Sequence, residues 1–379
     1  MIYISYYTDS QDVRISSPAA NAKTLSISRA LQKNGYRIKI YSTCTTATKG
    51  GWISKRNFDL DVGIACRQIG FFSSKIGLAR RLQYYWANVR TFFTLLCNVK
   101  KGEDVLFYHA IERSYPVLLA KKIKKFRLIL EVEEIYANAR KLTKKEIREE
   151  QREFQAADAF IFPTERLNEL VNKTGRPYAI IHGTYEVEPV LNSPAEDGIL
   201  HVVYAGTLDP VKGGAYIATE IATFLDEGYH IHILGFGEAC LVEEIRKKIS
   251  WIQQETKCQI SYDGCLLGDE YKHFLQACHV GLSTQNPEQN FNDSSFPSKI
   301  LSYMANGLDV VSVRIPVVES SAVDGYVHYA NEYSPRAFAD AIRQIKLNDK
   351  NSGREWIQRL NLEFTKDVTK VLQTKERQN

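Results

Sequence analysis

The chain has 379 residues, which is enough for two domains of ordinary size. Its 44% hydrophobic and 25% charged residues exclude a disordered or fibrous protein. No uncharged apolar run approaches the ~20 residues of a membrane-spanning helix, and the first residues lack the pattern of a secretory signal. The seven cysteines contain no CxxC pair. We therefore expect a cytoplasmic protein with reduced thiols.

The net charge of +5 conceals two regions of opposite sign. Up to residue 185 there are 31 lysines and arginines against 17 acidic residues, and from residue 186 onward there are 18 against 27. This asymmetry predicts two domains with different partners, the first of which contacts something anionic. Nucleic acid, a membrane surface and a pyrophosphate-bearing substrate all satisfy that condition.

Short β-branched runs alternate with longer amphipathic stretches, which is typical of parallel sheets covered by helices. In the first half, a helix is expected over 21–34 and strands over 2–6, 37–41, 105–108, 128–132, 159–162 and 178–182. In the second half, strands are expected over 200–205, 230–234, 259–262, 280–283, 310–313 and 327–329. Helices are expected between them, over 215–226, 241–255, 270–277, 297–306 and 335–346.

The pattern therefore predicts an α/β fold of two doubly wound, Rossmann-like domains facing a cleft, since ligands bind at the carboxyl ends of such strands. We place the N-terminal domain at 1–185 and the C-terminal domain at 199–353. Residues 186–198 contain prolines and no periodicity, which predicts a linker, and 354–379 begins with an amphipathic helix.

Three turns of the second half are suited to an anion. They are GTLDPVKGG at 206–214, GFG at 235–237 and PSK at 297–299, each after a predicted strand. Glycine lets a phosphate approach the backbone, a helix N-terminus favours negative charge, and lysine adds a cation. Taken alone, the first turn is better explained as an ordinary βα loop with a solvated lysine, and GFG as a tight turn.

In order and spacing, these turns resemble those of retaining glycosyltransferases of the GT-B fold, particularly glycosyltransferase family 4. The likeness runs through 206–213, 233–237, 262–266 and 297–307. Weaker likeness covers 18–35, 104–109 and the closing segment, which is similar to a helix that crosses back onto the first domain. The resemblance implies a nucleoside diphosphate sugar as co-substrate, no further cofactor, and a leaving phosphate that takes the acceptor proton.

The resemblance also assigns site residues. Catalytic roles fall on His109, Lys212 and Lys299, with both lysines contacting the donor diphosphate. The implied donor-binding residues are Gly206, Thr207, Gly235, Gly237, Gly264, Cys265, Leu266, Ser298, Ile300 and Ser302. The implied acceptor-side residues are Ala20, Asn21, Glu133 and Glu134.

Two of these assignments have structural alternatives. His109 either bonds a sugar hydroxyl or polarises the reacting centre, or it is a satisfied histidine near a strand end. Glu133 and Glu134 follow a predicted strand, where a carboxylate orients an acceptor or stabilises an oxocarbenium-like centre. For at least one of them a solvated loop is the alternative.

The chain departs from the family at two positions. The family usually has glutamates eight positions apart, the second of which holds the donor ribose, whereas this chain has Ser294 and Ser302. A serine bonds a hydroxyl more weakly and with shorter reach than a carboxylate. We expect Glu288 and Asp293 to compensate, and the two lysines favour an active enzyme over a non-catalytic copy.

Segment 67–101 interleaves basic and aromatic residues, and 121–125 adds a second basic run. This composition indicates helices on an anionic membrane surface, with a core helix that has a solvated basic face as the alternative. No RNA-binding signature accompanies it, so no nucleic-acid partner is expected. Asp59 and Asp61 form an Asp-x-Asp pair outside the donor half, so they are interpreted as surface carboxylates and no metal is predicted.

The sequence thus predicts a metal-independent hexosyltransferase that moves a sugar from a nucleoside diphosphate sugar to a glycan acceptor. The acceptor is expected to be lipid-linked and presented at the inner face of the cytoplasmic membrane, for surface polysaccharide assembly. One alternative is a nucleotide-sugar epimerase of similar build, which needs carboxylates and histidines for proton transfer. The other is a non-catalytic GT-B subunit that binds a partner or a membrane through its basic face.

Overall fold

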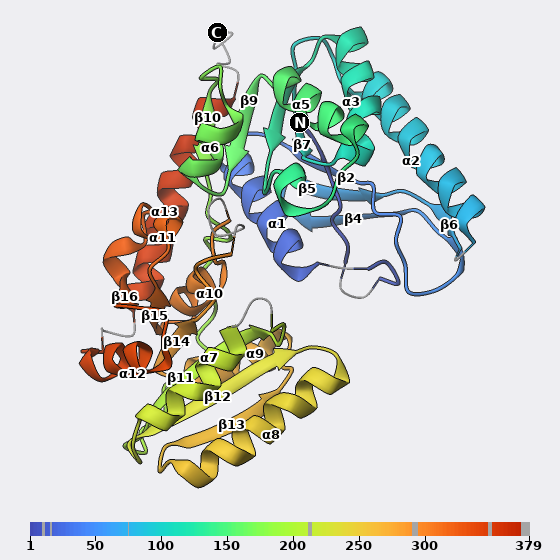
Figure 1. Ribbon diagram of the computed structural model, residues 1–379. Helices are drawn as coiled ribbons and strands as arrows, with labels where there is room; N and C mark the ends of the chain where they lie inside the picture. The colour runs from blue at the N-terminus through green and yellow to red at the C-terminus, as the bar shows by residue number, and fades with distance from the viewer. Residues whose placement is uncertain are drawn as a thin grey trace. The chain divides into compact units, whose positions relative to one another are not determined.

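The computed structural model describes residues 1–9, 12–15, 17–74, 76–210, 214–289, 295–347 and 351–372. The chain forms two compact units (Figure 1). The first contains Met1–Thr184 together with the segment that begins at Leu362, and the second contains Tyr185–Asn361. Each unit has its own sheet with helices, so the predicted α/β fold with two Rossmann-like units is confirmed.

The first unit is built on an eight-stranded sheet with the order β10-β9-β8-β7-β1-β2-β5-β4. Its strands are β1 (Ile2–Ser5), β2 (Ile38–Ser42), β4 (Arg56–Asp61), β5 (Ile64–Gln68), β7 (Asp104–Tyr108), β8 (Arg127–Glu131), β9 (Ala159–Phe162) and β10 (Tyr178–Ile180). All neighbours are parallel except β4 and β5, which form an antiparallel pair at one edge. A separate two-stranded antiparallel sheet joins β3 (Gly51–Ile53) to β6 (Phe71–Ser73).

The helices of this unit are α1 (Pro18–Lys33), α2 (Gly77–Asn98), α3 (Ile111–Lys124), α4 (Tyr136–Ala139), α5 (Lys144–Ala156) and α6 (Glu165–Val171). The 3₁₀ helix η4 (Val368–Val371) belongs to it as well. Sequence analysis missed strands β3 to β6, because their short, polar and alternating stretches lack the continuous apolar runs of the central strands.

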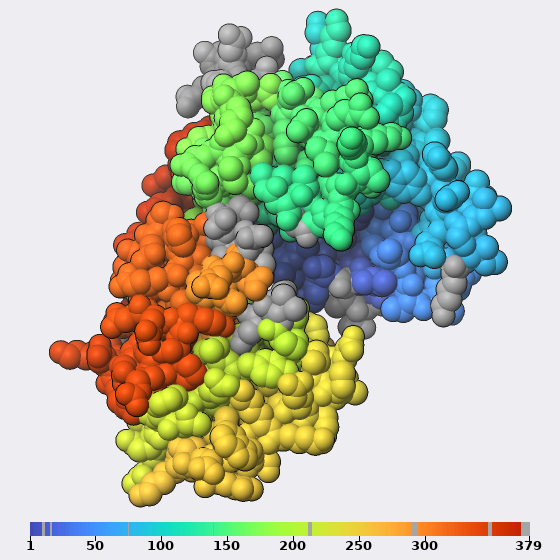
Figure 2. Space-filling model, viewed as in Figure 1, coloured from blue at the N-terminus to red at the C-terminus, as the bar shows by residue number. Residues whose placement is uncertain are grey.

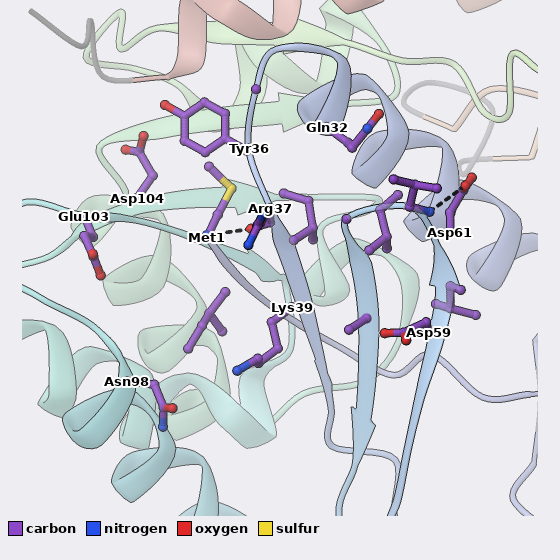
Figure 3. A pocket seen from close by; sticks show the side chains of 18 of the residues that line it. Met1, Gln32, Tyr36, Arg37, Lys39, Asp59, Asp61, Asn98, Glu103 and Asp104 are labelled. Carbon is purple, nitrogen blue, oxygen red and sulfur yellow. Dashed lines mark hydrogen bonds between the residues drawn. The ribbon is translucent and has the colours of Figure 1, made fainter.

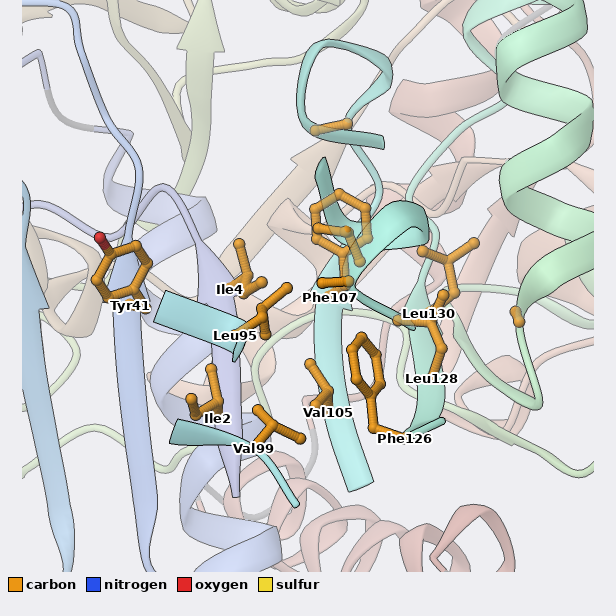
Figure 4. Close-up of a cluster of buried hydrophobic side chains, with 14 of the residues drawn as sticks. Ile2, Ile4, Tyr41, Leu95, Val99, Val105, Phe107, Phe126, Leu128 and Leu130 are labelled. Carbon is orange, nitrogen blue, oxygen red and sulfur yellow. The ribbon is translucent and has the colours of Figure 1, made fainter. Parts of the chain in front are cut away.

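The core of the first unit gathers alternate residues of its central strands (Figure 4). Successive side chains of a strand point to opposite faces, so one set from β1, β7 and β8 packs towards α2 and α3. Its members are Ile2, Ile4, Val105, Phe107, Leu128 and Leu130, joined by Leu95 and Val99 from the end of α2. Each fully buried side chain of this kind contributes about 1.5–3 kcal/mol by leaving water.

The second unit has a six-stranded, fully parallel sheet with the order β13-β12-β11-β14-β15-β16. The strands are β11 (Leu200–Thr207), β12 (Tyr229–Phe236), β13 (Gln259–Gly264), β14 (Val280–Ser283), β15 (Asp309–Val313) and β16 (Val327–Ala330). The helices are α7 (Gly214–Ile221), α8 (Ala239–Glu255), α9 (Gly268–Ala277), α10 (Lys299–Ala305), α11 (Pro316–Glu319) and α12 (Pro335–Gln344), with 3₁₀ helices η1 (Ala222–Phe224) and η3 (Asp324–Tyr326). The strand order reverses between β11 and β14, which is where doubly wound sheets bind ligands.

Two connecting segments complete the chain. Residues 186–198 have no helix or strand, and they are held to the second unit because the Gln276 side chain accepts hydrogen bonds from the backbone of Leu191 and Asn192. Helix α13 (Ser352–Asp367) begins in the second unit and ends in the first, where it continues into η4. Among the described residues, no helix has the length and apolar character needed to cross a bilayer.

Candidate functional site

The donor-side glycines lie at the carboxyl ends of β11 and β12. Gly206 and Gly235 are paired in register there, and a Cβ atom on Gly235 would lie 2.1 Å from the Gly206 carbonyl oxygen. A Cβ on Gly206 would lie 3.1 Å from Lys299 Nζ, and one on Gly237 would lie 3.2 Å from Leu208 Cβ. The strand ends are therefore packed so closely that glycine is required at these positions.

Lys299 places a cation beside this backbone. It begins α10 and is half-buried, with Nζ 4.1 Å from the centre of the Tyr204 ring. Tyr204 in turn donates a hydrogen bond to the Thr207 carbonyl at 3.0 Å, so the ring that contacts the lysine also fixes the turn. Ser298, the N-cap residue, is exposed and makes no capping hydrogen bond with its side chain.

Tyr303 fixes helix α10 against the sheet. Its hydroxyl accepts from the Ala205 backbone at 2.9 Å and donates to the Leu282 carbonyl. A Cβ on Gly281 would lie 2.2 Å from the Tyr303 ring, so only glycine lets the helix pack this closely. Ile300 is fully buried in the same interface, so only its backbone can contact a ligand.

The remaining donor-side predictions fall on neighbouring positions. Gly264 ends β13 next to Leu234, in the left-handed region with φ +85°, and Cys265 and the half-buried Leu266 follow it. The Tyr262 hydroxyl ties this strand to the Gly235 carbonyl at 2.9 Å. The structure therefore brings the predicted residues of β11, β12 and β13 to one edge of the sheet.

Ser302, where the family usually has a glutamate, has a local partner. A hydrogen bond joins its hydroxyl to that of Tyr271 in α9. Sequence reasoning missed Tyr271, because it lies 31 residues before Ser302 and in no motif. Glu288 is exposed, and its backbone N–H donates a hydrogen bond to the Asn286 side-chain oxygen at 3.0 Å within its own turn. Lys212, Asp293 and Ser294 lie outside the described residues.

In the first unit, His109 follows β7 and is buried between two carboxylates. Its Nδ1 lies 2.7 Å from Glu153 Oε1, and its Nε2 lies 3.1 Å from Glu150 Oε1. Burial alone lowers the pKa of His109, but the charges and hydrogen bonds of Glu153 and Glu150 outweigh it and raise the pKa to about 9. The ring also stacks on Tyr136 at 4.6 Å. Both ring nitrogens are thus engaged, as in the structural alternative for this residue, and a sugar hydroxyl would have to displace a carboxylate.

The other acceptor-side predictions surround the ends of β1 and β8. Glu133 pairs with Lys23 of α1 at 2.5 Å, while Glu134 is half-buried in the same loop. Asn21 accepts a hydrogen bond from the Thr8 backbone at 3.1 Å and so braces the loop after β1, with the half-buried Ala20 beside it.

Glu131 is a member of this group that sequence reasoning missed. It ends β8, is buried, and accepts a hydrogen bond from the Tyr3 hydroxyl. Burial, together with the charge of Glu133, raises the pKa of Glu131 to about 8. Its position two residues before Glu133, at the end of an apolar run, was the signal that could have identified it.

The first unit also has a hollow of about 1140 Å³, which lies at the amino ends of β1, β2, β5 and β7 (Figure 3). Asp59 and Asp61 line it as exposed carboxylates of the edge strand β4, and Asp61 pairs with Arg29 at 3.0 Å. Parallel sheets of this class bind ligands at their carboxyl ends, so this hollow lies at the wrong edge for a substrate site.

Comparison with known proteins agrees with this geometry. Residues 200–348 match the family model of Glycosyl transferases group 1. The fold of the whole chain is also found in solved glycosyltransferases. Together, these findings support a GT-B glycosyltransferase. They do not single out family 4 within that group.

The structures that share the GT-B fold are distant in sequence. The trehalose 6-phosphate synthase of Burkholderia multivorans is 13% identical, with a TM-score of 0.64 over 97% of this chain and 94% of that one. A glycosyltransferase of Rickettsia africae is 12% identical, with a TM-score of 0.65 over 98% and 97% of the two chains. The HepE protein of Anabaena, solved with UDP and glucose, is 14% identical, with a TM-score of 0.61 over 98% and 96%. No curated protein sequence matches the chain significantly.

Proposed function

We propose that the protein transfers a hexose from a nucleoside diphosphate sugar to a glycan acceptor, with retention of configuration and without a metal. The observation that carries this proposal is the contact between Gly206 and Gly235 with Lys299 beside it. In this proposal the donor diphosphate binds at the end of β11 and contacts the Lys299 cation. Cleavage of the sugar–phosphate bond develops negative charge on the departing diphosphate, so fixed dipoles and cations stabilise the transition state more than the ground state.

In this proposal the remaining residues have distinct roles. Lys212 and the Ser298 hydroxyl add donors to the diphosphate, and the leaving phosphate takes the acceptor proton. Glu133 and Glu134 orient the acceptor. His109 acts as a positioning residue, because its carbonyl accepts a hydrogen bond from Tyr136 at 2.8 Å and its ring is held by two carboxylates.

The test is a binding screen by thermal shift and calorimetry against UDP-, GDP-, ADP- and dTDP-sugars in EDTA. A specific ligand raises the melting temperature by mass action. We expect one nucleotide family to stabilise the protein, and Lys299→Ala to abolish that stabilisation. Lys257→Ala is the matched control, since that lysine is 81% exposed and has only a loose contact with Glu227 at 3.7 Å. If no nucleotide sugar binds at millimolar concentration, the proposal is wrong and a non-catalytic subunit becomes the better reading.

We further propose that the acceptor is lipid-linked and that α2 holds the first unit on the inner face of the cytoplasmic membrane. One face of α2 packs on the core through Ala87, Thr91 and Leu95. Helix α2 lies on the surface of the first unit, in light blue in Figure 2, and many of its exposed side chains are apolar. The exposed apolar residues recur with helical period at Leu78 (69%), Leu82 (62%), Trp86 (49%), Val89 (45%) and Phe93 (56%).

Two further observations extend this face. Trp52 and Phe72 are directly paired across β3 and β6, and both are exposed. Arg80, Arg81 and Arg90 lie among the apolar residues of α2 and can contact anionic headgroups. An amphipathic helix with this composition binds at the interface of a bilayer and does not cross it.

Vesicle co-sedimentation tests this second proposal. The protein should bind vesicles that contain phosphatidylglycerol better than neutral phosphatidylcholine vesicles, and the double variant Leu82→Glu, Trp86→Glu should lose binding. Trp251→Glu is the control, because Trp251 is equally exposed, at 60%, on helix α8 of the other unit. Unchanged binding by the double variant contradicts the proposal.

A further inference from the structure

Three histidines meet on one face of the second sheet. His201 of β11 pairs in register with His230 of β12, and His232 follows two residues later on the same face. One nitrogen from each ring can be chosen so that all three lie within 4.8 Å of one another. The rings of His230 and His232 are only 3.8 Å apart, and the Phe274 ring closes the cluster against His232 at 5.2 Å.

Each of the three rings has an oxygen partner at one nitrogen. Asp197 Oδ2 lies 3.1 Å from His201 Nε2, and Asp263 Oδ2 lies 3.1 Å from His232 Nδ1. The Ser261 hydroxyl lies 3.0 Å from His230 Nε2. A carboxylate or hydroxyl that holds one nitrogen of an imidazole, and so orients the other, is the usual outer partner of a histidine that binds a metal.

The nitrogens turned away from these oxygens converge. His201 Nδ1 and His232 Nε2 lie 2.9 Å apart, and His230 offers a ring nitrogen to the same group. Tetrahedral Zn–N bonds of about 2.0–2.1 Å place ligand nitrogens about 3.3 Å apart, so a small outward movement of two rings accommodates an ion. Valine and isoleucine are the usual residues of a covered sheet face, so three adjacent imidazoles there are uncommon. A cation between the rings would be bound by their nitrogen lone pairs.

We propose that His201, His230 and His232 bind one Zn²⁺ ion, with water in the fourth position and with Asp197, Asp263 and Ser261 as outer partners. Imidazole nitrogens with oxygen-rich surroundings suit zinc among the common divalent ions. The ion would join β11 to β12 directly and β13 through its outer partners. It is independent of the proposed sugar transfer.

The position of this site separates it from the proposed sugar transfer. His201 lies five residues before Gly206, and His230 lies five residues before Gly235 on the next strand. At about 3.3 Å per residue, the ion would lie roughly 16 Å from that glycine contact. It would therefore stabilise the strands that carry the donor turns without touching a donor, so metal-independent transfer and a bound zinc are compatible.

The test uses the full chain, stripped with EDTA and dialysed, and then titrated with Zn²⁺ by calorimetry, with elemental analysis for stoichiometry. We expect one ion per chain, a melting temperature raised by on the order of 5 °C at saturation, and tetrahedral visible absorption on substitution with Co²⁺. His230→Gln and His201→Gln should each weaken binding at least 100-fold, and Asp263→Asn roughly 10–100-fold.

His328→Gln is the matched control, because His328 of β16 also faces a carboxylate, Asp309 at 3.5 Å, but lies outside the cluster. Its zinc affinity should equal that of the unchanged protein. His201 is near a strand end, so His201→Gln keeps the test valid if a variant at the buried His232 does not fold. The proposal is overturned if no ion binds, or if binding persists in the histidine variants and disappears when the cysteines are alkylated. The nucleotide-sugar screen in EDTA fails or succeeds separately.

Discussion

The residues at the carboxyl ends of the strands differ in chemistry between the two units. In the second unit, the edge of the sheet is backbone, because Gly206 and Gly235 approach too closely for any side chain. In the first unit, the corresponding edge is a set of buried charges, with His109 between Glu150 and Glu153 and with Lys23 beside Glu133. The glycine contact requires close packing of backbone, whereas the charged groups of the first unit satisfy one another. The proposed function assigns donor binding to the second unit and acceptor binding to the first.

Among variants that test this difference between the units, His109→Asn is expected to lower the free energy of unfolding most. Removing the cation leaves two buried carboxylates without their partner, which costs about 3–5 kcal/mol of unfolding free energy. The folded pKa of about 9 exceeds the ordinary histidine value of 6.5, so the stabilisation is complete below pH 6.5 and is lost as pH rises through about 9. Urea titrations at pH 6, 7.5 and 9 should show this loss in the unchanged protein and no such loss in the variant. An equal decline in both would contradict the buried ion pairs.

The glycine edge can be broken with a single methyl group. In Gly235→Ala the new Cβ would lie 2.1 Å from a carbonyl oxygen, and overpacking of this kind costs about 1–3 kcal/mol. Nucleotide-sugar binding should be lost as well, as measured by calorimetry. Gly228→Ala is the control at the opposite end of the same strand, where the nearest atom is a side-chain oxygen of Asp226 at 3.2 Å. If both variants bind donor equally well, the close approach has no part in the site.

The third effect concerns Glu131→Gln and is visible only as a change of stability with pH. Burial raises the pKa of Glu131 to about 8, above the ordinary value of 4.5, so its contribution to stability is lost as pH rises between these values. The amide cannot ionise, so the variant should gain stability relative to the unchanged protein as pH rises from 5 to 8, by at most about 1.4 kcal/mol per pH unit. Thermal unfolding across this range measures the difference. A constant difference at every pH would show that Glu131 titrates normally.

The same contrast explains what the sequence could predict. The donor edge was predictable, since a glycine turn is local and Gly206, Gly235 and Gly264 each follow an apolar strand that is visible in the sequence. Strands β11 to β16 were found for the same reason: parallel strands buried on both faces form continuous apolar runs.

The acceptor edge was less predictable because its contacts join distant parts of the chain. His109 contacts Glu150 and Glu153, which are 41 and 44 residues away on helix α5. No local sequence pattern predicts contacts between residues so far apart. The three histidines of the zinc proposal show the same limit, since His201 lies 31 residues before His232 and only the register of β11 and β12 brings them together.

Helix α13 gives this molecule an unusual order of assembly on the ribosome. The first unit needs the end of the chain, because Val368 and Val371 are fully buried in it, the Arg127 side chain donates to the Val371 carbonyl at 2.7 Å, and the Asn34 side chain donates to the Thr365 carbonyl at 2.8 Å. The second unit is one uninterrupted segment that ends at Asn361. Domains usually complete their folding in the order of synthesis, but here the unit made first is finished last. A nascent chain halted before η4 would therefore have a complete second unit and a first unit that still lacks part of its core.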